Sequence, residues 1–145
     1  MCIEVLKKRF YITQKPKTCY KVLLKHNRKL YPPYFYEKTS YKFNLKYSIP
    51  EGEFEETIEN PISLYHSSNK AITTVGFYSF NNIDGARKLK NKLENNIFYH
   101  NRVHFVIVEC EIPEDTKYLS GHEHILEKSY QSYCSQSIII RKIIE

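Results

Sequence analysis

Hydrophobic and polar positions along the chain follow two periods. Over residues 41–48, aromatic or aliphatic residues alternate with polar ones, which is the period of a strand with one buried face. Elsewhere, short aromatic or β-branched runs bounded by turn residues or proline also indicate strands. Together these patterns predict strands over residues 19–24, 41–48, 75–80, 104–112 and 137–144.

The second period is helical and directly follows the strand at residues 75–80. Asn81 and Asn82 carry amide side chains suited to an N-cap, and the helix is expected to stop at residues 95–96. Four apolar residues share one arc of the helical wheel: Ile83, Ala86, Leu89 and Leu93. The outer face is basic and carries Arg87, Lys88 and Lys92.

Glycine and polar clusters predict where the chain bends. Gly76, at the entry of its strand, indicates a bend or a close backbone approach. Residues 26–29 predict a polar turn after the first strand, and Gly121 predicts another turn. Residues 50–59 form an acidic loop, which is either solvated or a lid over a basic pocket. Six or more strands with one good helix predict a single α+β domain over residues 1–145.

Composition narrows the classes of partner. A net charge of +6 and a pI near 9.0 favour anionic partners. Thirteen tyrosines and eight phenylalanines suit both β-rich cores and nucleotide pockets. No apolar run reaches membrane-spanning length and no signal-peptide pattern opens the chain, so we expect a cytoplasmic protein with no membrane partner. The four cysteines are scattered, so we expect reduced thiols that are mostly packed inside.

Few residues suggest catalysis or cofactor binding. Glu109 and Glu111 fall on one strand face and could share acid–base work. His122 and His124 alternate in an expected turn, but surface histidines are the favoured interpretation over a metal site. Cys134 has no identifiable base. A G-x-G-x-x-G or P-loop signature is absent, and we expect no cofactor and no metal.

Segments over nearly the whole chain resemble a family of small uncharacterised phage and bacterial proteins. The segments that carry the resemblance are residues 19–23, 33–34, 76–80 with Ala86, 108–113, 132–133 and the closing isoleucine-rich strand. The resemblance implies a phage or bacterial origin, and hence the cytoplasm of a bacterial host. It implies no known activity.

A second resemblance concerns the fold. Gly76-Phe77-Tyr78 followed by the Ala86 helix resembles the G-x-Y…A segment of ADP-ribosyltransferases, in which the tyrosine lines the nicotinamide pocket. This implies a mixed, mainly antiparallel split β-sheet with one main helix. Tyr20 and Lys21 stand where the family has a His-Gly or Arg strand. Gln136 is the closest equivalent of the catalytic glutamate, and an amide does not stabilise an oxocarbenium ion as a carboxylate does. The resemblance therefore implies the scaffold without the reaction.

The leading hypothesis is a non-catalytic binding protein for an anionic, nucleotide-like small molecule such as a host immune signalling nucleotide. Tyrosines would stack on a ring, and basic side chains would meet phosphates. The expected ligand-binding residues are Tyr20, Arg28, Tyr34, Tyr78, Arg87, Lys88, Tyr133 and Gln136. Two alternatives stay open: a protein-directed inhibitor of a host defence factor, and an active ADP-ribosyltransferase or nucleotide-processing enzyme that uses Glu109 or Glu111. Homo-oligomerisation also stays open.

Overall fold

One large antiparallel sheet and a single main helix make up the described part of the chain. The computed structural model describes residues 4–5, 10–33, 40–54, 71–72, 76–96 and 104–145. The strands are β1 (Glu4–Val5), β2 (Tyr11–Ile12), β3 (Lys17–His26), β4 (Lys29–Tyr31), β5 (Lys46–Ser48), β6 (Ala71–Ile72), β7 (Phe77–Phe80), β8 (His104–Ile112), β9 (Lys117–Ile125), β10 (Lys128–Ser135) and β11 (Ser137–Ile143). The main helix is α2 (Ile83–Glu94). Residues 51–54 are also helical, which corrects the first half of the acidic loop predicted over residues 50–59, and residues 55–59 lie outside the described residues. The predicted α+β class is confirmed.

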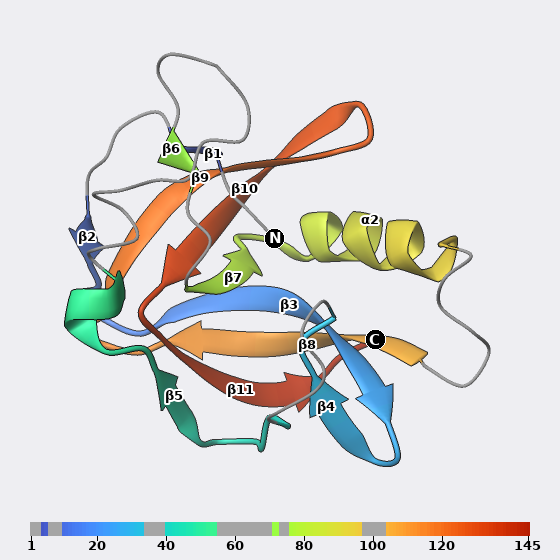
Figure 1. Cartoon of the computed structure of the whole chain (residues 1–145), viewed down its shortest axis with the longest axis horizontal. Coiled ribbons are helices and arrows are strands. Elements are labelled where there is room, and N and C mark those ends of the chain that lie inside the picture. The colour runs from blue at the N-terminus through green and yellow to red at the C-terminus, as the bar shows by residue number, and fades with distance from the viewer. Residues whose placement is uncertain (1–3, 6–9, 34–39, 55–70, 73–75, 97–103) are drawn as a thin grey trace.

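The sheet consists of two groups of strands that meet at one narrow junction. Its strand order is β5-β11-β8-β3-β7-β10-β9-β1-β6, with β4 beside β3 and β2 beside β9 (Figure 1). Strands β3 and β8 pair over nine residues, and β9 and β10 pair over eight. In contrast, β3 and β7 share a single register pair, Tyr20 opposite Phe80. We call this contact the β3–β7 junction. The two groups of strands therefore share only this one register pair among the described residues.

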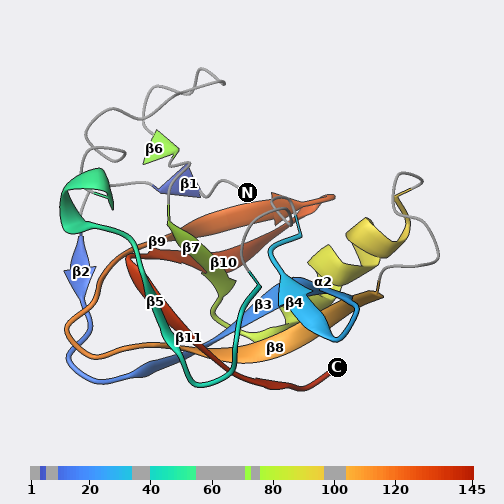
Figure 2. The same cartoon turned by 60° about the horizontal axis from the view of Figure 1, so that its bottom comes forward.

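Helix α2 covers one face of the sheet, against β3 and β8 (Figure 2). Asn82 is the N-cap: its side chain accepts a hydrogen bond from the Gly85 N–H at 3.5 Å, and Asp84 lies in the first turn. Ala86, Leu89 and Leu93 are buried, as predicted, in a core that includes residues of β3, β7 and β8. A second core lies around the Cys19–Cys110 pair of β3 and β8. The helix and its apolar face were thus predictable from spacing alone.

Gly76 takes a backbone conformation that other residues rarely adopt. Its φ is +142°, and a Cβ atom built there would clash with the sulfur of Cys134. Phe54 packs beside the same spot. The predicted bend and close backbone approach are both confirmed.

The prediction of a turn at Gly121 was wrong. Gly121 is buried within β9 and lies opposite Ser132 of β10. Three of the eight residues of β10 are serines, so the strand that pairs with β9 carries too few apolar residues to show a strand period. The turn between the two strands comes later, at Leu126, where φ is +58°. His122 and His124 accordingly lie on a strand and not in a turn.

The alternating segment over residues 41–48 forms a strand only at its end. Residues Lys46–Ser48 make β5, while Asn44 has a positive φ of 59° that interrupts the extended backbone. Phe43 and Leu45 are 47% and 48% exposed. A half-buried strand was therefore the wrong interpretation for most of this segment. The closing strand was predicted correctly, with Ile138 and Ile140 fully buried.

A candidate ligand-binding pocket

The tight hairpin between β3 and β4 brings the basic residues Lys25 and Arg28 to one end of β3. Strands β3 and β4 are joined by Asn27 and Arg28, which both have positive φ angles of 50° and 65°. Two such residues in a two-residue loop form a type I′ turn, whose twist matches that of the flanking strands. The turn predicted at residues 26–29 is confirmed. Asn27 suits this conformation, whereas Arg28 occupies the position where glycine is preferred.

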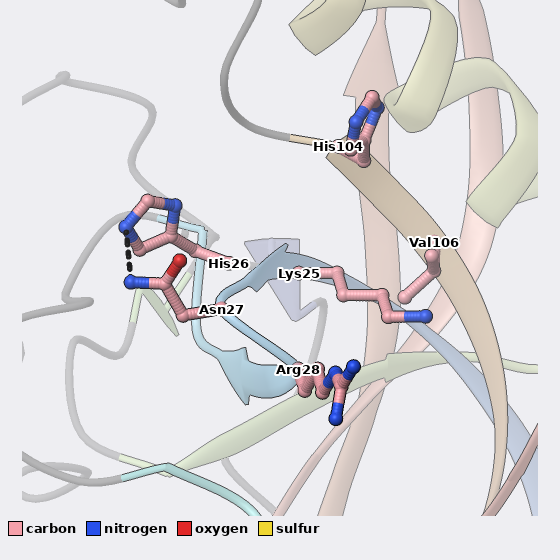
Figure 3. Close-up of a pocket in the computed structure, with 6 residues that line it drawn as sticks. All are labelled: Lys25, His26, Asn27, Arg28, His104 and Val106. Carbon is pink, nitrogen blue, oxygen red and sulfur yellow. Dashed lines mark hydrogen bonds between the residues drawn. The ribbon is translucent and has the colours of Figure 1, made fainter.

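An open pocket lies between this hairpin and the start of β8, with a volume of about 740 Å³ (Figure 3). Lys25 and His104 are register partners on the neighbouring strands β3 and β8, so their side chains leave the sheet on the same face. Arg28 comes from the turn. The described lining residues are Lys25, His26, Asn27, Arg28, His104 and Val106. The pocket thus combines four basic or imidazole side chains with one apolar residue.

The charges at the pocket remain hydrated. Lys25, Arg28 and His104 are exposed, while His26 and Val106 are partly buried. Figure 3 shows the Lys25 side chain extending along Val106, with Arg28 directed to the same side of the hairpin and His26 to the other. The Asn27 amide nitrogen lies 3.2 Å from His26 Nε2. No carboxylate is among the described lining residues. Such an arrangement attracts an anion and contributes no general acid or base carboxylate.

The structure places only one of the eight predicted ligand-binding residues, Arg28, at this pocket. Tyr34 lies outside the described residues. Tyr78 is 8% exposed and packs in a small core with Phe54 and Leu119, which leaves little ring surface for stacking. Tyr20 is partly buried against the core beneath α2. The expected stacking role of Tyr78 is therefore corrected, because its ring packs inside the protein, and Tyr20 packs partly against the core.

Two further residues of the predicted set have structural partners inside the protein. Tyr133 is 3% exposed, its hydroxyl donates to Asn81 Oδ1 at 2.8 Å, and burial raises the pKa of its phenol. The Gln136 amide donates to the Ile49 carbonyl at 3.1 Å and so ties the start of β11 to the segment after β5. Both side chains hold strands together.

The basic face of α2 is also not part of the pocket. Arg87 Nε donates to both carboxylate oxygens of Glu145, at 2.9 and 3.1 Å, and this bond raises the pKa of the guanidinium. Asp84 lies 3.6 Å from the same side chain. Lys88 is partly buried on the helix. The predicted phosphate-binding role of Arg87 and Lys88 has no support from this placement, because the arginine fork already holds a carboxylate.

Sequence reasoning missed Lys25, His26, His104 and Val106. Lys25 and His26 precede the correctly predicted turn, so a basic turn was a usable signal. His104 and Val106 lie nearly eighty residues further along the chain. Only the pairing of β3 with β8 brings them to the hairpin, and this register is not visible in one sequence.

Glu109 and Glu111 lie on one strand face, as predicted, and both are held by cations of β11. Arg141 Nη2 lies 2.5 Å from Glu111 Oε2, and Lys142 Nζ lies 3.9 Å from Glu109 Oε2. Each carboxylate therefore serves the pairing of β8 with β11. This arrangement gives the two glutamates a structural task and does not direct them at the pocket.

Within the described part of the chain, no three His, Cys, Asp or Glu side chains converge as a metal site requires. His124 faces Ser129 across the β9–β10 pair, at 3.0 Å between Nδ1 and Oγ. Among the same residues, no helix has the length and apolarity to cross a membrane.

The chain matches no protein-family model, no curated protein and no solved structure.

Proposed function

We propose that this chain is a non-catalytic binding protein that captures an anionic, nucleotide-like small molecule in the pocket between the β3–β4 hairpin and β8. The observation that carries the proposal is the convergence of Lys25, Arg28 and His104 around one opening with no described carboxylate among them. Phosphate groups are the anions such a set suits best. Arg28 offers a bidentate fork, and Lys25 offers a compact point charge.

The pocket also suits the size and shape of a nucleotide. Its volume of about 740 Å³ lies inside the range of 300–1,000 Å³ that is usual for small-molecule sites. The imidazole ring of His104, on the same face as Lys25, offers a planar surface on which a base can stack, and Val106 supplies an apolar contact. In this proposal His104 takes the stacking role that the sequence had suggested for tyrosines.

Binding without turnover is favoured over the enzyme alternative. Glu109 and Glu111 are paired with Lys142 and Arg141, and neither lines the described pocket. Nucleotide hydrolysis or ADP-ribosyl transfer needs a carboxylate or another base within reach of the reacting atoms. The described lining residues include no carboxylate, so the group that the enzyme alternative requires from Glu109 or Glu111 is not among them.

The scaffold and the biological role are further parts of the proposal. The narrow β3–β7 junction between two strand groups supports an ADP-ribosyltransferase-like split sheet, with the helix after β7 in the expected place. If the resemblance to small phage proteins holds, the captured ligand is a signalling nucleotide of the bacterial host, and capture in the host cytoplasm would blunt a defence response.

A protein-directed inhibitor is the second candidate. Phe43 and Leu45 are about half exposed beside the edge strand β5, and Ile143 of the neighbouring β11 is 38% exposed. Apolar side chains next to an open sheet edge are typical of surfaces that bind another protein. A stable complex with a host protein that Phe43→Ser abolishes, and that Arg28→Gly leaves intact, would favour this candidate.

The test of the leading proposal is calorimetric titration with NAD, ADP-ribose and cyclic oligonucleotides. We expect at least one to bind with a Kd below about 100 μM, which corresponds to about −5.5 kcal/mol. Arg28→Gly and Lys25→Ala should each weaken that binding about tenfold or more, because each removes a charge from the pocket. Lys128→Ala removes an exposed lysine of the β9–β10 hairpin and serves as the matched control. Equal affinities in all four proteins, or no binding by folded wild-type protein, would refute the pocket.

A further inference from the structure

Two cysteines face each other in the middle of the sheet, away from the pocket. Cys19 of β3 and Cys110 of β8 are direct register partners. Opposite residues of antiparallel strands have Cα atoms about 4.5 or 5.5 Å apart, and both values fall within the range of about 4.4–6.8 Å seen in disulfides. The side chains leave the sheet on the same face, and both thiols are free. A disulfide between them would thus require little backbone movement.

The two thiols differ in their readiness to ionise. Burial opposes ionisation of Cys19, but its neighbours Cys110 and Ser79 and the positive charges of Lys21 and Lys17 outweigh burial and lower the thiol pKa. Burial and the neighbouring Cys19 raise the pKa of Cys110 well above its ordinary value, and the Cys110 thiol donates to the Val108 carbonyl at 3.8 Å. Cys19 is therefore the better nucleophile of the pair, and Cys110 keeps its proton.

Lys21 is fixed next to this pair at the β3–β7 junction. Its ammonium group donates a hydrogen bond to the Tyr78 carbonyl of β7, where β3 and β7 no longer pair. Burial lowers the pKa of Lys21, and the neighbouring sulfurs of Cys110, Cys19 and Cys134 act in the opposite direction. The Lys21 amine is thus held at the β3–β7 junction, two residues along β3 from Cys19 and on the same strand face.

We propose that Cys19 and Cys110 form a reversible redox pair, in which peroxide oxidises Cys19 and Cys110 closes the disulfide. In the first step the Cys19 thiolate attacks one peroxide oxygen, the O–O bond breaks, and the departing hydroxide takes a proton to become water. In the second step the Cys110 sulfur attacks the sulfenic sulfur of Cys19, the S–O bond breaks, and a second water leaves with the Cys110 proton. Two thiols and one peroxide give one disulfide and two waters.

Access to the pair requires a transient opening. Cys19 is 0% exposed and Cys110 is 1% exposed. The β3–β7 junction is a site for such an opening, because Tyr20 and Phe80 are its one register pair among the described residues and few backbone bonds need to break there. The redox pair goes beyond the proposed binding function and does not depend on the pocket.

The test uses full-length protein carrying Cys2→Ser, since Cys2 lies outside the described residues. Folded protein is treated with hydrogen peroxide and digested without reduction, and the linked peptides are identified by mass spectrometry. We expect the loss of two hydrogens, one Cys19–Cys110 crosslink, and full reversal by dithiothreitol. Oxidised protein should also melt at a higher temperature than reduced protein.

Three variants separate this mechanism from general thiol oxidation. Cys110→Ser should stop at a sulfenic acid on Cys19 that dimedone traps, and Lys21→Met should slow oxidation about tenfold at neutral pH. Cys134→Ser removes the third buried cysteine and should behave as the parent does. The proposal is overturned if the thiols of folded protein stay reduced, if the crosslink joins other cysteines, or if Cys110→Ser yields no Cys19 adduct.

Discussion

Arg28 combines a backbone cost with a side-chain role. Its φ of 65° places a long side chain in the left-handed region, which costs a non-glycine residue roughly 1–2 kcal/mol. Arg28 follows Asn27 at the second central position of a type I′ turn, where glycine is the usual residue. An arginine there directs its guanidinium into the pocket. Strain of this kind is commonly kept where a side chain serves a function.

Arg28→Gly should therefore separate stability from binding. Glycine relieves the left-handed strain, which raises the free energy of unfolding, but it also gives the unfolded chain more freedom, which lowers it. The sum of the two effects should leave the free energy of unfolding unchanged or raise it by up to about 1 kcal/mol. Urea denaturation measures this change on the same samples used for titration. A clear loss of stability would show that the Arg28 side chain supports the hairpin, which would contradict its assignment to a ligand.

Gly76 is the second residue whose backbone decides its identity. Gly76→Ala should lower the free energy of unfolding by about 2 kcal/mol or more, because φ is +142° and the new methyl group would meet Cys134. Gly52→Ala is the control, since no atom lies within 4 Å of a Cβ at that position. Urea unfolding curves of the two variants should diverge. If both variants were as stable as the parent, the close contact between β7 and β10 would be wrong.

At the scale of elements, helix α2 shows what sequence patterns can predict. Its N-cap, acidic first turn and apolar arc are local features, and each follows from residues at most four positions apart. Strand β10 shows the opposite case. Its buried residues include Ser132, Cys134 and Ser135, which are polar or small, so burial there comes from neighbouring strands. The same limit applies to the pocket, because His104 reaches Lys25 only through register.

Strand β9 carries a carboxylate that couples stability to pH. Burial raises the pKa of Glu123 to about 7, and the charges of Lys92 on α2 and Lys21 on β3 oppose this shift only in part. One of its oxygens, Oε2, is buried and has no hydrogen-bond partner among the residues that the structure describes. A carboxyl group whose pKa is higher in the folded state stabilises the fold while it is protonated. This contribution is complete at low pH and disappears as pH rises toward 7.

Glu123→Gln should remove this pH dependence. The free energy of unfolding of the parent, compared with that of the variant, should fall as pH rises from about 4.5 to 7, and the variant should be the more stable protein at pH 8. Urea titrations at several pH values measure the difference. Glu127→Gln changes an exposed glutamate beyond the end of β9 and should run parallel to the parent. If the stability of Glu123→Gln also ran parallel to that of the parent over this pH range, the Glu123 carboxylate of the parent would be hydrated.

At the scale of the whole molecule, a net charge of +6 adds a general attraction for anions to the local charge of the pocket. Because Lys25, Arg28 and His104 are exposed, salt should screen both effects. We expect ligand affinity to fall about tenfold as ionic strength rises from about 0.05 to about 0.5 M, where the screening length becomes much shorter. Calorimetric titration at increasing sodium chloride concentrations measures this change in affinity. An affinity independent of salt would point to an apolar site elsewhere.

The central claim is that the pocket captures a nucleotide-like anion and does not change it. The most direct test mixes folded protein with NAD, ADP-ribose derivatives or cyclic oligonucleotides, removes unbound ligand by filtration, and analyses the retained fraction by mass spectrometry before and after heat denaturation. We predict that one ligand is depleted from the filtrate and returns intact on denaturation, and that Arg28→Gly retains far less of it. Recovery of a product in place of the ligand, or equal retention by the variant, would contradict the account.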